Sequence, residues 1–156
     1  MTLTGSGFLA GESVGILDDF GPFSVATADG SGAVVAGGSV PPAPYGKNSF
    51  VALGQTSGRR AVARFFVTPR LFTVPSTVRV GSVVKVTGYG LNAHDLIDVY
   101  VDSFALAGSS VSDSHGTMAG TNAVQFTVPA RLTPGNHVIS ALGSNGVSAQ
   151  ASITVE

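Results

Sequence analysis

The chain has 156 residues, no cysteine and a formal net charge of −1 at pH 7. The lack of cysteine excludes disulfides and thiolate metal sites, and the near-neutral charge disfavours binding to a nucleic-acid backbone. No stretch approaches the ~18 consecutive apolar residues of a membrane helix. The N-terminus also lacks the basic and apolar regions of a signal peptide, so export, if it occurs, depends on a part of a longer parent protein.

Residues near the N-terminus begin a pattern that returns in the second half of the chain. Residues 3–12 (LTGSGFLAGE) return as residues 86–95 (VTGYGLNAHD), and residues 52–54 (ALG) return as residues 141–143. A repeat of this length corresponds to one small domain. We therefore predict two domains, 1–68 and 69–156, which a short link makes into a semi-rigid rod. Two further pairs of segments line up between these anchors: residues 29–32 (DGSG) with 113–116 (DSHG), and Val40-Pro41 with Val128-Pro129.

The two copies differ at their start. Residues 71–85 precede the repeated motif in the second copy, whereas only Met1 and Thr2 precede it in the first. We therefore expect the first domain to lack its opening strand, which would expose backbone groups and part of the apolar interior. Either the chain is an excerpt whose preceding repeat has been cut away, or another chain donates a strand by β-augmentation. On the sequence alone we favour the excerpt.

Both halves alternate apolar and polar residues with a period of two, which predicts half-buried antiparallel strands. Turn signals such as Asp29-Gly30 and Asn145-Gly146 separate these strands, and no helical period is present, so we expect an all-β sandwich. Phe8 and Leu91 follow the repeated glycines and are expected to plug the ends of the sandwiches. The predicted inward residues are Ala61, Ala63, Phe65 and Val67 in the first copy and Val84, Val86, Ile97, Val99, Val101, Val147, Ala149, Ala151, Ile153 and Val155 in the second.

Residues 75–91 (PSTVRVGSVVKVTGYGL) resemble the opening of a bacterial immunoglobulin-like repeat of the IPT/TIG kind. Residues 128–139 are similar to a later stretch of that family, with His137 in place of an aromatic residue and Asn48 at the matching position of the first copy. The resemblance implies two tandem immunoglobulin-like antiparallel β-sandwiches, the first lacking its opening strand. It also implies that there are no catalytic residues, because such modules serve as spacers, adhesin stalks, enzyme appendages and virion domains.

Carboxylates and histidines are the first candidates for chemistry. Calcium favours clusters of oxygen ligands at loop ends, which makes Asp18, Asp19 and Asp29 the calcium candidates. No spacing of the aspartates reproduces a calcium loop. We therefore favour turn or solvated positions both for these three residues and for the second carboxylate group given below, and we predict no cofactor. His137 falls on an inward strand position, where a core histidine satisfied by the backbone is the better interpretation than a metal ligand. The second carboxylate group is Asp95, Asp98, Asp102 and Asp113, and the other histidines, His94 and His115, fall in predicted loops.

Partner binding is the remaining possibility for individual side chains. Arg59, Arg60 and Arg64 form a basic cluster that could contact an anionic polysaccharide or a partner's carboxylates, although charge that protects an edge strand is the plainer interpretation. Aromatic residues in predicted loops could cap the sandwiches or contact protein or sugar. The aromatic residues in this set are Phe20, Phe23, Tyr45, Phe72, Tyr89 and Phe104.

The leading functional hypothesis is a non-enzymatic structural or adhesive module, a spacer or stalk of a bacterial cell-surface or secreted protein. The main alternative is a virion component, such as a capsid decoration or tail domain that assembles through sheet edges. A weaker alternative is a carbohydrate-binding appendage of a hydrolase. The expected partners are proteins, further copies of the chain that bind at the open edge of the first domain, or a surface polysaccharide, and not nucleic acid or a membrane interior.

Overall fold

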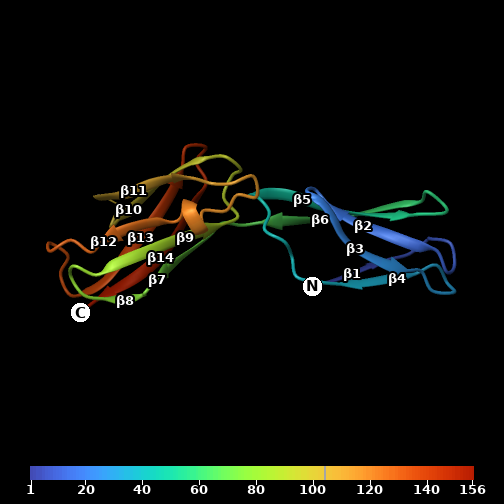
Figure 1. Cartoon of the computed structure of the whole chain (residues 1–156), viewed down its shortest axis with the longest axis horizontal. Coiled ribbons are helices and arrows are strands. Elements are labelled where there is room, and N and C mark those ends of the chain that lie inside the picture. The colour runs from blue at the N-terminus through green and yellow to red at the C-terminus, as the bar shows by residue number, and fades with distance from the viewer. Residues whose placement is uncertain (104) are drawn as a thin grey trace. The chain divides into compact units, whose positions relative to one another are not determined.

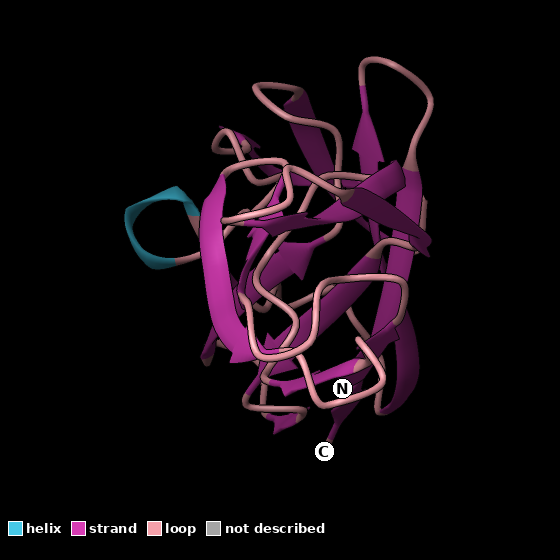
Figure 2. Ribbon diagram, turned by 90° about the vertical axis from the view of Figure 1, so that its right-hand side faces the viewer, coloured by secondary structure: helices cyan, strands magenta, loops and turns pink. Residues whose placement is uncertain are grey.

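The computed structural model describes residues 1–103 and 105–156 and is built from β-strands and loops, with one turn of 3-10 helix, η1 (Gly120–Asn122) (Figure 1, Figure 2). The strands form two compact units. The first unit comprises Met1–Pro41 and Lys47–Phe66, and the second comprises Pro42–Gly46 and Val67–Glu156. In the part of the chain that the structure describes, no helix has the length and hydropathy needed to span a bilayer.

The second unit is a sandwich of two sheets. One sheet has the order β11-β10-β13-β14-β8 and the other has the order β12-β9-β7. Neighbouring strands are antiparallel except β8, which runs parallel to β14. This order is that of an immunoglobulin-like sandwich, in which the opening strand divides itself between the two sheets. The strands are β7 (Arg70–Val74), β8 (Thr77–Val78), β9 (Val83–Tyr89), β10 (Leu96–Val101), β11 (Ala105–Val111), β12 (Val124–Thr127), β13 (Gly135–Gly143) and β14 (Ser148–Val155).

The core of the second unit is one continuous cluster between its sheets. Its strands bury alternate residues because successive side chains of a strand point to opposite faces of a sheet. The predicted inward residues Val84, Val86, Ile97 and Val99 are fully buried, which confirms the period-two interpretation. The opening strands contribute Leu71 from β7 and Val78 from β8 to the same cluster. Leu91 is also buried in this cluster, as expected for a residue that plugs the sandwich.

The first unit repeats this plan with fewer strands. Its sheets have the orders β3-β2-β5-β6 and β4-β1, which match β11-β10-β13-β14 and β12-β9 of the second unit strand for strand. Among the described residues, no strand of the first unit corresponds to β7 or β8, in agreement with the expected lack of an opening strand. The strands are β1 (Thr2–Gly5), β2 (Ser13–Asp18), β3 (Gly21–Thr27), β4 (Val34–Gly37), β5 (Gly46–Gly54) and β6 (Arg60–Val67).

The buried residues of the first unit form two separate small clusters rather than one. The first cluster contains Phe8 and Val14, and the second contains Ile16 and Phe50. Phe8 is 5% exposed and so plugs its unit as Leu91 plugs the other. The first unit lacks counterparts of β7 and β8, which in the second unit add the buried side chains of Leu71 and Val78 to the single core cluster.

The repeated Asp-x-x-Gly turn has the same geometry in both units. Asp29 and Asp113 each accept hydrogen bonds from backbone N–H groups two and four residues later. Gly32 and Gly116 follow with φ of +78° and +66°, a region that L side chains rarely adopt. A Cβ at either glycine would collide with the carbonyl oxygen of the plug residue, which explains why both copies have glycine at this place.

Candidate functional site

The first unit has an open edge where the second unit has its opening strands. In the second unit β7 pairs antiparallel with β9, with Leu71 opposite Gly88, and β8 pairs with β14. The equivalent strands of the first unit are β1 and β6, and no strand of the described chain lies beside either of them on that side. An edge of this kind is a template for pairing with a further strand. We call the exposed sides of β1 and β6 together the open edge.

Side chains along the open edge are less buried than their counterparts in the second unit. Leu3 is only partly buried, whereas Val86, at the matching position of β9, is fully buried. Ala63 is exposed and Phe65 partly buried, whereas Ile153, the counterpart of Phe65, is 1% exposed. The interior of the first unit is therefore uncovered along the two strands that β7 and β8 would flank.

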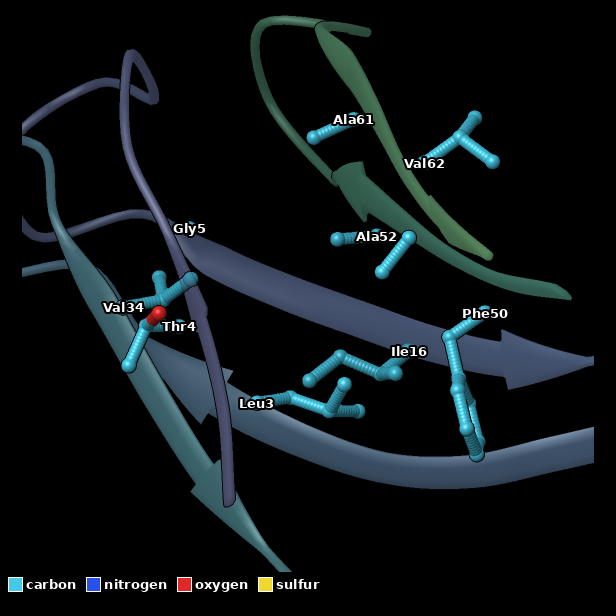
Figure 3. Close-up of a pocket in the computed structure, with 10 residues that line it drawn as sticks. Leu3, Thr4, Gly5, Ile16, Val34, Phe50, Ala52, Ala61 and Val62 are labelled. Carbon is cyan, nitrogen blue, oxygen red and sulfur yellow. The ribbon is translucent and has the colours of Figure 1, made fainter. Parts of the chain in front are cut away.

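An apolar cavity of ≈ 80 Å³ opens between these two strands. Figure 3 shows Leu3, Ile16 and Phe50 along its length, with Ala52 and Ala61 on the facing strands. Its labelled side chains are almost entirely carbon, so the cavity suits an aliphatic side chain rather than a polar ligand. The lining residues are Leu3, Thr4, Gly5, Ile16, Val34, Phe50, Ala52, Ala61, Val62 and Ala63.

In the second unit Leu71 packs at the matching place beside Gly88, together with Leu91 and Met118. The Leu71 side chain is 6% exposed and packs in the common core, with its Cδ1 atom 3.4 Å from the place where a Cβ on Gly88 would lie. Gly5 is the counterpart of Gly88: it pairs with Val34 as Gly88 pairs with Met118. Further counterparts of the cavity lining are Val86 for Leu3, Val99 for Ile16, Ile139 for Phe50 and Ala149 for Ala61.

A carboxylate clamps two loops together in each unit, and the two carboxylates occupy the same place in the repeat. Glu12 is 6% exposed and accepts hydrogen bonds from the backbone N–H groups of Leu9 (2.6 Å) and Ser57 (2.9 Å) and from the Ser57 hydroxyl (2.8 Å). Burial by itself raises the pKa of Glu12, but these hydrogen bonds and one from Thr56 outweigh it and lower the pKa to about 2.

Asp95 performs the same task in the second unit. It is 2% exposed, which corrects the expectation that it is a solvated or turn residue. It accepts hydrogen bonds from the Ser144 hydroxyl, from Asn145 Nδ2 (3.0 Å) and from Asn92 Nδ2 (3.3 Å). Burial opposes ionisation here too, and the hydrogen bonds outweigh it, so the pKa of Asp95 is lowered.

His137 is buried on an inward position of β13, as the sequence predicts. Its Nε2 lies 2.7 Å from the Thr133 carbonyl oxygen, which is the expected backbone partner. Its Nδ1 lies 2.7 Å from Asp102, a partner that the sequence does not suggest. Asp102 lies in the turn after β10, which ends at Val101, and it has a φ of +51°.

Each of the three calcium candidates accepts hydrogen bonds within the first unit. Asp18 accepts hydrogen bonds from the two backbone N–H groups of its own turn at 2.8 Å, and Asp19 binds the backbone and hydroxyl of Ser49 at 2.7 Å. Asp29 accepts hydrogen bonds from the Ser31 hydroxyl and from backbone N–H groups of its own turn, and these hydrogen bonds lower the pKa of Asp29. Across the described residues, no three acidic or histidine side chains gather in a manner that could hold a metal ion.

The residues considered for partner binding do not form one patch. Arg60 and Arg64 are exposed on β6, which is an edge strand of its sheet, and Arg59 Nη1 donates to the Gly7 carbonyl oxygen at 2.5 Å.

The aromatic candidates differ in burial. Phe20 is 45% exposed, but Phe23 packs on the core with its ring 4.9 Å from that of Phe50. Tyr45 is 41% exposed and belongs to the second unit, and its N–H donates to the Leu91 carbonyl oxygen at 2.8 Å. Phe72 and Tyr89 meet edge to face at 6.0 Å, and Phe104 lies outside the described residues.

No protein-family model matches the sequence, and no curated protein matches it either. Solved structures with a similar arrangement include a glycosyl hydrolase family 2 member from Bacteroides cellulosilyticus (15% identity, 93% of this chain and 22% of that chain, TM-score 0.44). A biofilm-associated protein domain is also similar (16% identity, 99% of this chain and 27% of that chain, TM-score 0.37). So is a beta-glycosidase from Bacteroides vulgatus (12% identity, 99% of this chain and 24% of that chain, TM-score 0.43). The chain spans about a quarter of the length of each. All three TM-scores are below 0.5, so the immunoglobulin-like fold rests on the strand order of the chain itself.

Proposed function

We propose that the chain is a non-enzymatic structural or adhesive module, a semi-rigid spacer or stalk in a bacterial cell-surface or secreted protein. In this proposal the repeats 1–68 and 69–156 are tandem domains of the IPT/TIG kind. The observation that carries it is the use of the buried carboxylates. Glu12 and Asp95 hold loops at the same place in each repeat, so these two buried carboxylates, whose pKa values are lowered, serve the architecture.

A distance measurement between the two repeats tests the spacer function. The chain has no cysteine, so Thr27→Cys in β3 and Gln125→Cys in β12 give two single spin-label sites on exposed strand positions. A semi-rigid spacer gives a narrow distribution of distances between the two labels. A distribution as broad as that of a flexible linker of the same length contradicts the proposal.

The open edge favours one alternative, a virion component that assembles through sheet edges. The native open reading frame and its neighbouring genes separate the surface protein from the virion component. An upstream export signal and further repeats favour the surface protein, whereas neighbouring capsid or tail genes favour the virion component. The exposed rings of Phe20 and Tyr45 would support a carbohydrate-binding appendage, and a glycan screen without hits removes that alternative.

A further inference from the structure

We propose that the open edge of the first unit is a docking site for an extended segment of a different polypeptide, which supplies the strand positions of β7 and β8. This goes beyond the spacer function, because it assigns a specific protein-binding site to one of the two units. The second unit shows what a filled site looks like, since the same repeat there has both strands in place.

The register of the docked segment follows from the β7 and β9 pairing. Leu71 lies opposite Gly88 and Thr73 lies opposite Val86. A docked strand would therefore run antiparallel to β1 with one residue opposite Gly5 and the residue two positions later opposite Leu3. Main-chain hydrogen bonds to the edge of β1 supply affinity, as in other cases of β-augmentation.

The cavity sets the specificity of the docked segment. The residue opposite Gly5 points between β1 and β6, into the cavity lined by Ile16, Phe50 and Ala61. In the second unit the opening strand β7 places a leucine, Leu71, opposite Gly88, the counterpart of Gly5. We therefore infer a segment with a leucine at this position and a small or aliphatic residue two positions later, because alternate residues of a strand face the same side.

Charge argues for a different polypeptide rather than a second copy of this chain. Arg60 and Arg64 are exposed on β6 beside the vacant position, and Arg59 adjoins them. Two copies joined through their β6 edges would bring these arginines together, which is unfavourable, whereas acidic residues in the part of the docked segment that takes the place of β8, beside β6, would be complementary. Donation of residues 70–78 by a second copy would uncover that copy's own core, since Leu71 and Val78 are buried there.

A synthetic peptide with the sequence of residues 69–80 (PRLFTVPSTVRV) is the probe. Titrated into the whole chain, it is expected to shift the amide signals of β1 and of the cavity lining. The same peptide with aspartate in place of its leucine is expected to bind about tenfold more weakly or worse, because the cavity accepts only an apolar side chain. A third peptide with glutamate in place of both arginines is expected to bind more tightly than the first, and more so at low salt.

Two chain variants locate the site. Ala61→Leu fills the cavity from β6 and is expected to abolish peptide binding, whereas Val35→Thr on the exposed face of β4 leaves it unchanged. Cysteine at Thr4 should form a disulfide with a peptide that carries cysteine at its Phe72 position, since Phe72 pairs with Thr87, the counterpart of Thr4. A peptide cysteine one residue away should react more slowly.

Three results would overturn the proposal. They are no binding at millimolar peptide, binding that the leucine-to-aspartate change leaves intact, and a self-associated chain whose dimer disappears in Ala61→Leu. The last result would assign the edge to a second copy. None of the three bears on the distance distribution that tests the spacer function, so the two proposals fail independently.

Discussion

His137 and Asp102 are joined by a 2.7 Å contact between Nδ1 and Oδ2 that ties β13 to the turn after β10. The other ring nitrogen faces the Thr133 carbonyl oxygen at 2.7 Å. Both partners are acceptors, so the ring must donate from both nitrogens, and only the protonated imidazolium can do so. The hydrogen bond to Asp102 is the largest cause of the raised pKa of His137, followed by the bond to Thr133.

Stability of the second unit should therefore depend on pH through this pair. The pKa of His137 is raised from its ordinary 6.5, so its stabilisation is fully present below about pH 6.5 and is lost as the pH rises through the folded-state pKa. The pKa of Asp102 is lowered from 3.8, so its contribution is present above about pH 3.8 and is lost as the pH falls through its own folded-state pKa. Urea unfolding should show wild type losing stability relative to His137→Gln as the pH rises above about 6.5. Parallel pH profiles for the two proteins would contradict this assignment.

Asp95→Asn should destabilise the loops that it clamps. The amide keeps the shape of the carboxylate but places an N–H₂ group against the donors Ser144 and Asn145, at a cost of about 1–3 kcal/mol. Chemical unfolding of the whole chain measures the loss. Asp98→Asn is the matched control, since Asp98 is partly exposed on β10 and its bond to Ser109 is at the surface. An equal effect of the two substitutions would argue against a special role for Asp95.

Glu12→Gln should have the corresponding effect on the first unit. Because the pKa of Glu12 is lowered to about 2, its stabilisation is complete above the ordinary value of 4.5 and is lost as the pH falls toward 2. Wild type and Glu12→Gln should therefore differ in stability at pH 6 and converge near pH 2. Hydrogen exchange of the Thr56 and Ser57 amides, which donate to Glu12, follows the change directly.

Gly116→Ala should cost more stability than Gly146→Ala, although both glycines have a positive φ (+66° and +83°). At Gly146 a Cβ meets nothing within 4 Å, so the cost is the backbone strain of about 1–2 kcal/mol. At Gly116 the Cβ would also collide with the Leu91 carbonyl oxygen, and the loop must shift. Thermal unfolding of the two variants side by side checks the order, and a reversed order would refute the close packing of the turn on Leu91.

Leu71→Ala and Ala61→Leu should change stability in opposite directions. Leu71→Ala opens in the second unit the space that the first unit already has, and buried Leu→Ala changes cost about 2–5 kcal/mol. Ala61→Leu reduces the cavity of the first unit and should stabilise that unit by about 0.5–2 kcal/mol. Hydrogen exchange resolved by unit measures both. Destabilisation by Ala61→Leu would mean that the space cannot accept a leucine.

Much of the fold is visible in the sequence because the driving pattern is local. The alternation of Val84 and Val86 or Ile97 and Val99 requires only that a strand present one face to a core. The missing opening strand could be predicted because the repeat supplies an internal reference. The clamp was partly visible as well, since Glu12 and Asp95 line up in the repeated segment, but their burial depends on loops more than 40 residues away.

Other features depend on contacts that no local pattern records. Asp102 meets His137 because β10 ends at Val101 and the chain turns there, and the two residues are 35 positions apart. The assignment of Pro42–Gly46 to the second unit has no signal in the alternation, because the segment is proline-rich and forms no strand before Gly46. The cavity beside Leu3 follows from side-chain volumes across two sheets, which the sequence does not specify.

Amide hydrogen exchange on the whole chain, compared strand by strand, tests most directly that the two units share one plan and differ in the open edge. Amides of β1 and β6 should exchange faster than those of β9 and β14, and fusing a copy of residues 69–83 in front of Met1 should slow them to the rates of the second unit. Equal protection of the two strand pairs without the fused segment, or no added protection with it, would contradict the account.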